Sequence, residues 1–285
     1  MIEFCQFELD SSVVAPVIYK DLPHRTTSVG LKVSKTVQEE LQKFLQGFLE
    51  FHGRSEHDTF IRVDAFFSQE KLYIIELNVE LADGWGVALN LARACNGGLV
   101  LPNTKMPSKY VAYSSNYLPE YQLAIEEFRL LGHSGVSIET HWGKTEEKDP
   151  LDNKLALEQF SRTQIAGVVG TPRMYSVENT PWVQVPEDVV FKFTEKYGSE
   201  ATRARYSVKK RSGIGKGEFM RKCYNRGRAI AQERIEPRRL SDGSVTQAII
   251  MCSGSTPVTG YLQVAEAREF IINDRTARKG PLLFT

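Results

Sequence analysis

The sequence lacks a dominant charge, a metal-binding cysteine pattern and a long apolar run. Its 36 Lys and Arg residues nearly balance 35 Asp and Glu residues, which leaves a formal net charge of +1. Without a field of one sign, the overall charge argues against a nucleic-acid or membrane-surface partner. The four cysteines, Cys5, Cys95, Cys223 and Cys252, lie far apart without CxxC or metal-ligand spacing. They indicate free thiols in a reducing compartment.

Signals for secretion, membrane insertion and nucleophilic catalysis are also missing. No apolar run approaches the length of a membrane span, and residues 1–12 have neither the basic start nor the apolar stretch of a signal peptide. We therefore expect a soluble cytoplasmic protein with no membrane partner. The five histidines show no ligand spacing, and residues 254–260, GSTPVTG, contain no nucleophile elbow. Catalysis through a Ser–His or metal–His site is not indicated.

What is present in the first half is a mixture of helical and strand patterns. Apolar residues at helical spacing predict an amphipathic helix over 36–53 that stops at Gly53. β-branched and aromatic residues predict strands over 60–68 and 71–79, joined by the polar turn SQEK. A helix is expected over 85–98.

A strand–helix–strand pattern follows and indicates a βαβ unit, most simply with parallel strands, over 109–115, 119–132 and 135–142. The remainder contains shorter elements. A charged linker leads into a helix within 145–168, and strand-like runs are expected at 171–177, 189–193, 229–235, 246–254 and 269–273. An α/β (α+β) protein results.

The hairpin over 60–79 carries polar residues where apolar ones would make a more stable sheet. Residues two apart share a face of a strand, so Arg62 and Asp64 point one way, as do Glu76 and Asn78. If the strands pair antiparallel, two carboxylates and an amide oxygen converge, and Mg²⁺ is the expected partner of such oxygens. The alternative is a half-exposed hairpin whose polar face meets water.

The pattern RVDAFF…KLYIIELN, with Asp64 twelve positions before Glu76 and Asn78 two after it, resembles the metal-binding strands of the ATP-grasp superfamily. In that family an aspartate, a glutamate and an asparagine hold magnesium. The strands usually come last in the chain, whereas here they lie in the first third. This order is similar to the permuted ATP-grasp enzymes of the glutathionylspermidine synthetase kind, where an R-x-D…E-x-N segment also comes first.

The resemblance also covers the expected ATP-binding pieces. LDNKLALEQF puts Lys154, and VPEDVVFKF puts Lys192, at the positions of the two ATP lysines, although Phe193 stands where proline is usual. AIAQERIEP resembles the hinge that meets adenine. There Gln232 would offer its amide to the base, and the backbone from Glu233 to Ile235 would pair with its edge.

Two glycine-containing stretches are candidates for the loop over the triphosphate. In KYGSEAT, directly after the Lys192 strand, backbone N–H groups of Gly198 and Ser199 could meet phosphate oxygens. The stretch 209–222, KKRSGIGKGEFMRK, is more basic, and a mobile surface loop or an RNA contact are alternatives for it.

The resemblance implies an ATP-grasp-like ligase, ADP-forming, that uses ATP and Mg²⁺ to join a carboxylate to an amine or a thiol through an acylphosphate, with Arg62 stabilising the transferring phosphoryl group. Its substrates would be small molecules, and a homo-oligomer is left open. We expect a metal-binding part over 1–105, a small βαβ domain over 106–149 and a nucleotide-binding part over 150–285. The alternative is a catalytically inactive ATP-grasp-like protein that binds nucleotide or regulates. An altered stretch at 83–86, DGWG, and the missing proline support that alternative, and Trp85 could flank an acceptor pocket.

Overall fold

The computed structural model describes most of the 285 residues. The described ranges are 2–55, 59–79, 83–95, 109–112, 115–140, 150–163, 167–194, 206–209, 214–266, 272 and 275–285.

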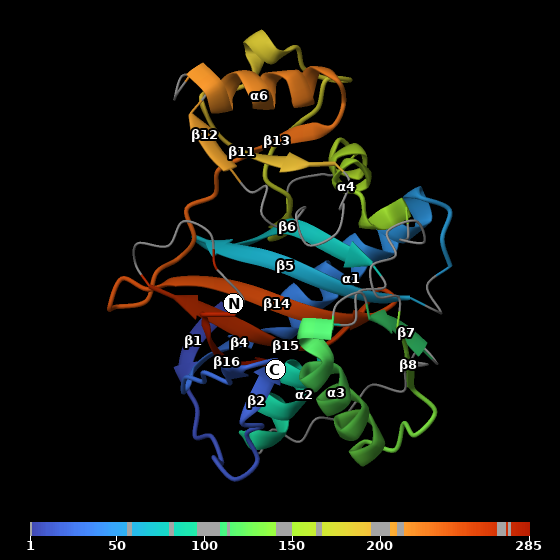
Figure 1. The fold of residues 1–285 in the computed structure, drawn as a ribbon, viewed down its shortest axis with the longest axis vertical. Helices are drawn as coiled ribbons and strands as arrows, with labels where there is room; N and C mark the ends of the chain where they lie inside the picture. Colours follow the sequence, from blue (N-terminus) through green and yellow to red (C-terminus); the bar gives the residue numbers. More distant parts are fainter. Residues whose placement is uncertain are drawn as a thin grey trace.

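A large mixed sheet of eight strands forms the body of the molecule (Figure 1). Neighbouring strands pair antiparallel except at two places, where β4 pairs parallel with β16 and β6 pairs parallel with β9. The strands, in spatial order, are β1 (Ile2–Gln6), β4 (Val29–Val33), β16 (Arg278–Phe284), β15 (Thr256–Ala265), β14 (Val245–Ser253), β5 (Phe60–Ser68), β6 (Lys71–Val79) and β9 (Val169–Gly170). The sheet thus joins strands from both ends of the chain.

Helices cover both faces of this sheet. On one face, α1 (Lys35–Phe51) and α4 (Lys154–Ser161) share a hydrophobic core with the strands. On the other face, α2 (Trp85–Ala94) and α3 (Leu118–Leu130) pack over the part of the sheet that contains Phe60 and Met251. The predicted amphipathic helix is confirmed as α1, and the chain leaves it through Gly53 at φ 67°, a conformation that glycine adopts without strain.

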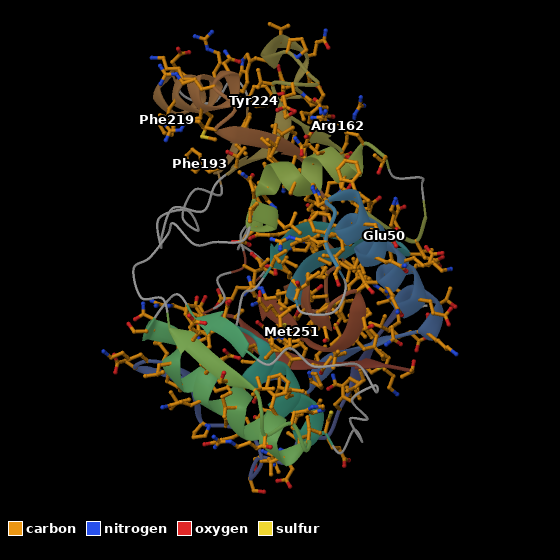
Figure 2. All side chains as sticks on the ribbon, turned by 90° about the vertical axis from the view of Figure 1, so that its right-hand side faces the viewer. Glu50, Arg162, Phe193, Phe219, Tyr224 and Met251 are labelled. Atoms are coloured by element: carbon orange, nitrogen blue, oxygen red, sulfur yellow. The ribbon has the colours of Figure 1, made fainter. Side chains whose placement is uncertain are left out.

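A smaller antiparallel sheet forms a second lobe above the large one, with α6 across it (Figure 1). Its strands, in spatial order, are β10 (Met174–Tyr175), β13 (Ala229–Glu233), β11 (Asp188–Phe193) and β12 (Tyr206–Lys209). The helix α6 (Ile214–Asn225) packs Tyr224 edge-on against Phe191, and Phe219 against Phe193 (Figure 2). Aromatic contacts of this kind hold α6 on the small sheet.

The predicted βαβ unit is confirmed. β7 (Lys109–Ala112) and β8 (Ser137–Thr140) pair parallel, with α3 between them in the chain. The remaining described elements are short: strands β2 (Val17–Tyr19) and β3 (Leu22–Pro23), and 3₁₀ helices η1 (Ser115–Tyr117), η2 (Pro150–Asp152) and η3 (Trp182–Gln184).

The fold is therefore a mixed α+β arrangement, as the sequence predicted. One expectation for the basic stretch is wrong: residues from Ile214 onward are helical, so Gly215 and Gly217 belong to α6 and not to a mobile loop. Gly213 lies outside the described residues. None of the described helices combines the length and apolar character needed to cross a bilayer.

Candidate functional site

The β5–β6 hairpin brings its four polar residues together. The strands are antiparallel, with Arg62 directly opposite Asn78 and Asp64 directly opposite Glu76. Directly opposed residues of an antiparallel pair project from the same face, so all four side chains lie on one face of the hairpin. The predicted convergence of the two polar pairs is confirmed.

These polar side chains do not form a surface that meets water. Asp64 and Glu76 are each 3% exposed, and Asn78 is fully buried. Burying two carboxylates costs free energy unless partners compensate their charge. The alternative of a solvated hairpin face is therefore wrong, and the partners of the buried groups decide what the site can do.

Asp64 lies at the centre of one group of contacts. Its carboxylate accepts hydrogen bonds from Arg62 Nε at 2.9 Å, Asn78 Nδ2 at 3.2 Å and Gln247 Nε2 at 3.1 Å. The guanidinium of Arg62 also donates through Nη1 to Asp83. Arg62 is thus held between two carboxylates in a fixed orientation, which a planar fork of five donors allows.

Glu76 lies at the centre of a second group, formed with one lysine at the start of α4 and one lysine on the small sheet. Lys154 Nζ is 2.7 Å from one carboxylate oxygen of Glu76, and Lys192 Nζ is 3.9 Å from the other. Lys154 is the first residue of α4, and its backbone N–H donates to the carbonyl of Thr194, just after the β11 strand that carries Lys192. Both ammonium groups are buried. The two sequence-predicted ATP lysines therefore meet the same carboxylate.

A β-bulge in the hairpin adds a further link. The register of β5 and β6 shifts after Asp64, so that Ile75 has no partner opposite it. Its carbonyl instead accepts hydrogen bonds from Lys192 Nζ at 2.5 Å and Gln232 Nε2 at 3.3 Å. The bulge thus satisfies a backbone acceptor with side chains of the small sheet. In this structure the Gln232 amide donor points at the hairpin, whereas its sequence-predicted partner was a base.

A cavity of about 70 Å³ lies beside these contacts, where β13 leaves the small sheet and the chain runs toward β14. Its walls combine apolar side chains with polar groups and backbone of the connecting segment. They are formed by Phe66, Ile75, Val190, Lys192, Gln232, Glu233, Arg234, Ile235, Glu236, Pro237, Arg239, Val245, Gln247 and Ile272. All three residues predicted to meet adenine, Gln232, Glu233 and Ile235, line this cavity together with Lys192. An apolar cleft with a few placed polar groups is typical of a ligand site.

The predicted metal ligands supply two carboxylates and one amide oxygen. Within the described ranges, no group of three or more His, Cys, Asp or Glu side chains is arranged to hold a metal ion. Asp64, Glu76 and Asn78 stay the predicted Mg²⁺ ligands, since Mg²⁺ is commonly bound through one or two carboxylates with substrate phosphates completing its coordination. In the structure Asp64 is engaged by Arg62 and by the Asn78 amide, and Glu76 is engaged by Lys154 and Lys192, so these contacts would have to exchange for the ion.

Three residues that the sequence analysis did not single out belong to the surroundings of Arg62: Asp83, Gln247 and Glu120. Asp83 and Gln247 contact the Arg62–Asp64 pair directly. The sequence signal for Gln247 was its position as a polar residue directly before the apolar run AIIMC. Glu120, on α3, is buried and accepts a hydrogen bond from the backbone of Gly86. Burial, with the nearby charge of Asp83, raises the pKa of the Glu120 carboxyl to about 8.

This raised pKa predicts how stability depends on pH. Between about pH 4.5 and 8 the folded protein holds a proton on Glu120 that the unfolded chain has released, so the free energy of unfolding falls as pH rises through this window. The slope is at most about 1.4 kcal/mol per pH unit. His24, whose pKa burial lowers to about 4, produces the opposite slope below pH 6.5. The Glu120 slope is therefore measured above pH 6.5.

Urea unfolding of the wild type and Glu120→Gln at pH 6.5, 7.0 and 7.5 tests this prediction. Glutamine cannot titrate, so the variant should lose the slope and gain stability relative to the wild type as pH rises. Parallel pH dependences of the two proteins would show that Glu120 is ionised in the folded state at neutral pH.

One further sequence prediction is wrong, and one lies outside the described residues. Trp85 is fully buried, with its ring packed against Phe60 and Phe128, so it does not flank an acceptor pocket. Gly198 and Ser199, the first candidates for a phosphate loop, lie outside the described residues.

Comparisons with known proteins leave the family open. No family model matches the chain, and no curated protein matches it. Among solved structures, a "putative gamma-glutamylcysteine synthetase" from Methylobacillus flagellatus KT is similar over 100% of this chain and 90% of that chain, with 12% sequence identity and a TM-score of 0.44. A TM-score below 0.5 does not establish a common fold, so the function must be argued from the site.

Proposed function

We propose that this protein is an ATP-dependent ligase of the ATP-grasp type, which joins a carboxylate to an amine or a thiol through an acylphosphate. The observation that carries the proposal is the meeting of Lys154 and Lys192 with Glu76. Two buried lysines, Lys154 at the start of α4 and Lys192 on the small sheet, contact the buried carboxylate of Glu76 on the large sheet, and Lys192 also lines the cavity. The lysines can bind the phosphates of a nucleoside triphosphate, and the carboxylates can bind the accompanying Mg²⁺.

The cavity would hold the base. Its apolar walls would contact the ring faces, and the chain from Glu233 to Ile235 would offer backbone groups to the ring edge. Lys192 lines the same cavity and also reaches Glu76, so a triphosphate leaving the cavity would pass toward the carboxylates. Gly198 and Ser199 remain the proposed contacts of the phosphates from the loop after β11.

Asp64, Glu76 and Asn78 would hold Mg²⁺, which would neutralise phosphate charge and orient the triphosphate. In the structure, the carboxylates are neutralised by Arg62, Lys154 and Lys192. On nucleotide binding the lysines would exchange Glu76 for phosphate oxygens. The Glu76 carboxylate would thereby become free to act as a Mg²⁺ ligand. Lys154 and Lys192 would thus neutralise Glu76 before nucleotide binds and the phosphates afterwards.

Arg62 would act on the transferring group. An oxygen of the substrate carboxylate attacks the γ-phosphorus, the bond to ADP breaks and an acylphosphate forms. The amine or thiol then attacks the acyl carbon, and inorganic phosphate leaves. The guanidinium, fixed by Asp64 and Asp83, would stabilise the negative charge on the phosphoryl oxygens in both steps. On this proposal residues 1–105 supply the metal ligands, 106–149 a small βαβ domain and 150–285 the nucleotide site.

The second candidate function is a protein that binds Mg·ATP without turning it over. The observation in its favour is that Trp85 is buried in the core. The stretch DGWG therefore has no large side chain that could contact an acceptor substrate. Both candidates bind nucleotide at the same place, and only ADP release separates them.

The nucleotide claim predicts that Mg·ATP raises the melting temperature of the wild type, because a ligand that binds only the folded state stabilises it. Lys192→Ala should lose most of this shift, since its ammonium group lies at the cavity and near Glu76. Lys222→Ala is the matched control, because Lys222 is 65% exposed on α6. The measurement is thermal unfolding with and without Mg·ATP.

Equal melting curves with and without saturating Mg·ATP would refute the proposal for the wild type, and equal losses in both variants would move the site elsewhere. Screening Mg²⁺-dependent ADP release over amino acids, short peptides and polyamines then separates the ligase from the non-catalytic binder.

A further inference from the structure

Glu120 connects the βαβ unit to the start of α2. It lies in the first turn of α3, is 1% exposed, and its Oε1 accepts a hydrogen bond of 2.6 Å from the backbone N–H of Gly86. One side chain from a different helix therefore serves a backbone N–H group in the first turn of α2.

The local sequence requires such a partner from outside. The residue that precedes α2 is Gly84, at φ 111°, and it provides no side-chain cap. The first N–H groups of a helix lack partners within the helix and need acceptors. Gly86 permits the approach of α3, because a Cβ at this position would lie 2.5 Å from the carbonyl oxygen of Glu120. Gly86 and Glu120 thus form one joint between α2 and α3.

This joint lies next to Asp83, the residue directly before Gly84. Asp83 accepts the hydrogen bond from Arg62 Nη1, while Arg62 Nε donates to Asp64. Asp83 lies in the turn at 83–84 that leads directly into α2. Its position relative to Arg62 depends on how the start of α2 is held.

We propose that Glu120 is a positioning residue for Arg62, which acts by fixing the turn that carries Asp83. The proposal rests on the proposed function in one respect, that Arg62 contacts the transferring phosphoryl group. It assigns the βαβ unit a task in the reaction: α3 brings Glu120 to the site and thereby sets the direction of the guanidinium.

If Glu120 only joined α2 to α3, its loss would affect stability and not turnover. Another buried glutamate between the same two helices provides a matched control. Glu127 is 2% exposed on the same helix and joins α3 to the other end of α2, where it accepts hydrogen bonds from Asn90 and Arg93. Glu127→Leu removes a buried carboxylate between the same two helices without touching the Asp83 turn.

The first experiment compares kinetics. Glu120→Leu should lower kcat for ADP release about 10- to 100-fold, the usual loss when a reacting group is misplaced by about 1 Å, with little change in KM for ATP. Glu120→Gln should recover much of this loss, because its amide oxygen can still accept from Gly86. Glu127→Leu should leave kcat near that of the wild type. Equal losses of kcat in the two leucine variants would overturn the proposal.

The second experiment does not depend on turnover. Arginine Nε–Hε resonances are recorded by NMR, and the Arg62 signal is identified as the one missing in Arg62→Lys. Glu120→Leu should shift this signal and speed the exchange of its proton with water, whereas Glu127→Leu should not. An unchanged Arg62 signal in Glu120→Leu would overturn the proposal. A wild type that releases no ADP would refute the ligase function alone, and the NMR comparison would still decide the role of Glu120.

Discussion

Replacing Glu76 by glutamine is expected to remove the Mg²⁺ dependence of ATP binding and to lower turnover by about 10³-fold, which corresponds to the several kcal/mol that a metal ion supplies to charge stabilisation. Glu76 is the carboxylate that contacts both lysines, at 2.7 Å from Lys154 and 3.9 Å from Lys192. The variant keeps the shape of the side chain and removes its charge.

Glu76→Gln should not weaken the binding of ATP in the absence of Mg²⁺. In the wild type the triphosphate must displace Glu76 from the ammonium groups, and Mg²⁺ favours this exchange because it binds the released carboxylate. In Glu76→Gln the triphosphate no longer has to displace the Glu76 carboxylate from the lysines, so ATP without Mg²⁺ should bind at least as well as it does to the wild type. Calorimetric titration of ATP with Mg²⁺ or with EDTA measures both states.

Glu158→Gln is the control for the loss of a buried ion pair. Glu158 is fully buried and is held by Arg162, at 2.7 Å and 3.0 Å, on the far part of α4. Removing the carboxylate destabilises the fold, although by less than breaking a fully buried pair would, because the side chain of Arg162 is 38% exposed and its charge meets solvent. Both variants should therefore be destabilised, yet only Glu76→Gln should change the Mg²⁺ dependence. The same Mg²⁺ dependence in Glu76→Gln and the wild type would exclude Glu76 as a ligand.

The local elements of the site could be predicted from sequence because their patterns are local. Alternation of side chains in 60–68 and 71–79 determines which residues share a face, and the polar turn between them sets an antiparallel register. The bulge at Ile75 was not predicted, because nothing in KLYIIELNV distinguishes a bulged strand from a regular one. The links from Lys192 and Gln232 to its carbonyl were therefore also missed.

Strands with glycine and proline were missed for a different reason. No strand was assigned to β15 or β16, which contain Pro257, Gly260, Gly280 and Pro281. These residue types usually mark turns or edges. Here they permit close contact: a Cβ on Gly260 would lie 2.5 Å from the carbonyl of Ile249, and one on Gly280 would lie 1.8 Å from that of Val29.

Asp83 and Glu120 could not be found from sequence, because their roles depend on contacts between separate segments. Asp83 lies 21 residues from Arg62, and Glu120 lies 34 residues from Gly86. DGWG was considered only as a departure from a family pattern. In the structure Asp83 holds Arg62, Trp85 fills the core and Gly86 allows α3 to approach.

Arg62→Lys is expected to lower turnover about 10²- to 10³-fold, the loss typical of removing one transition-state donor, while the affinity for Mg·ATP changes little. Lysine has one compact ammonium group and cannot contact Asp64, Asp83 and a phosphoryl group from one rigid plane. A contact that strengthens as the phosphoryl group transfers affects kcat more than binding.

Arg93→Lys separates this effect from a general sensitivity to arginine replacement. Arg93 also makes a two-pronged ion pair, donating to Glu127 through Nε at 2.9 Å and Nη2 at 2.7 Å, but its side chain is 43% exposed. Its replacement should leave both turnover and Mg·ATP affinity near those of the wild type. If Arg62→Lys instead weakened binding and turnover equally, Arg62 would contact the nucleotide in the ground state. If Arg62→Lys changed neither binding nor turnover while the wild type turned over ATP, the guanidinium would serve only to hold Asp64 and Asp83. The charge on the transferring group would then have to be stabilised by Lys154 and Lys192. In that case the alanine variants of these two lysines would show the loss in kcat.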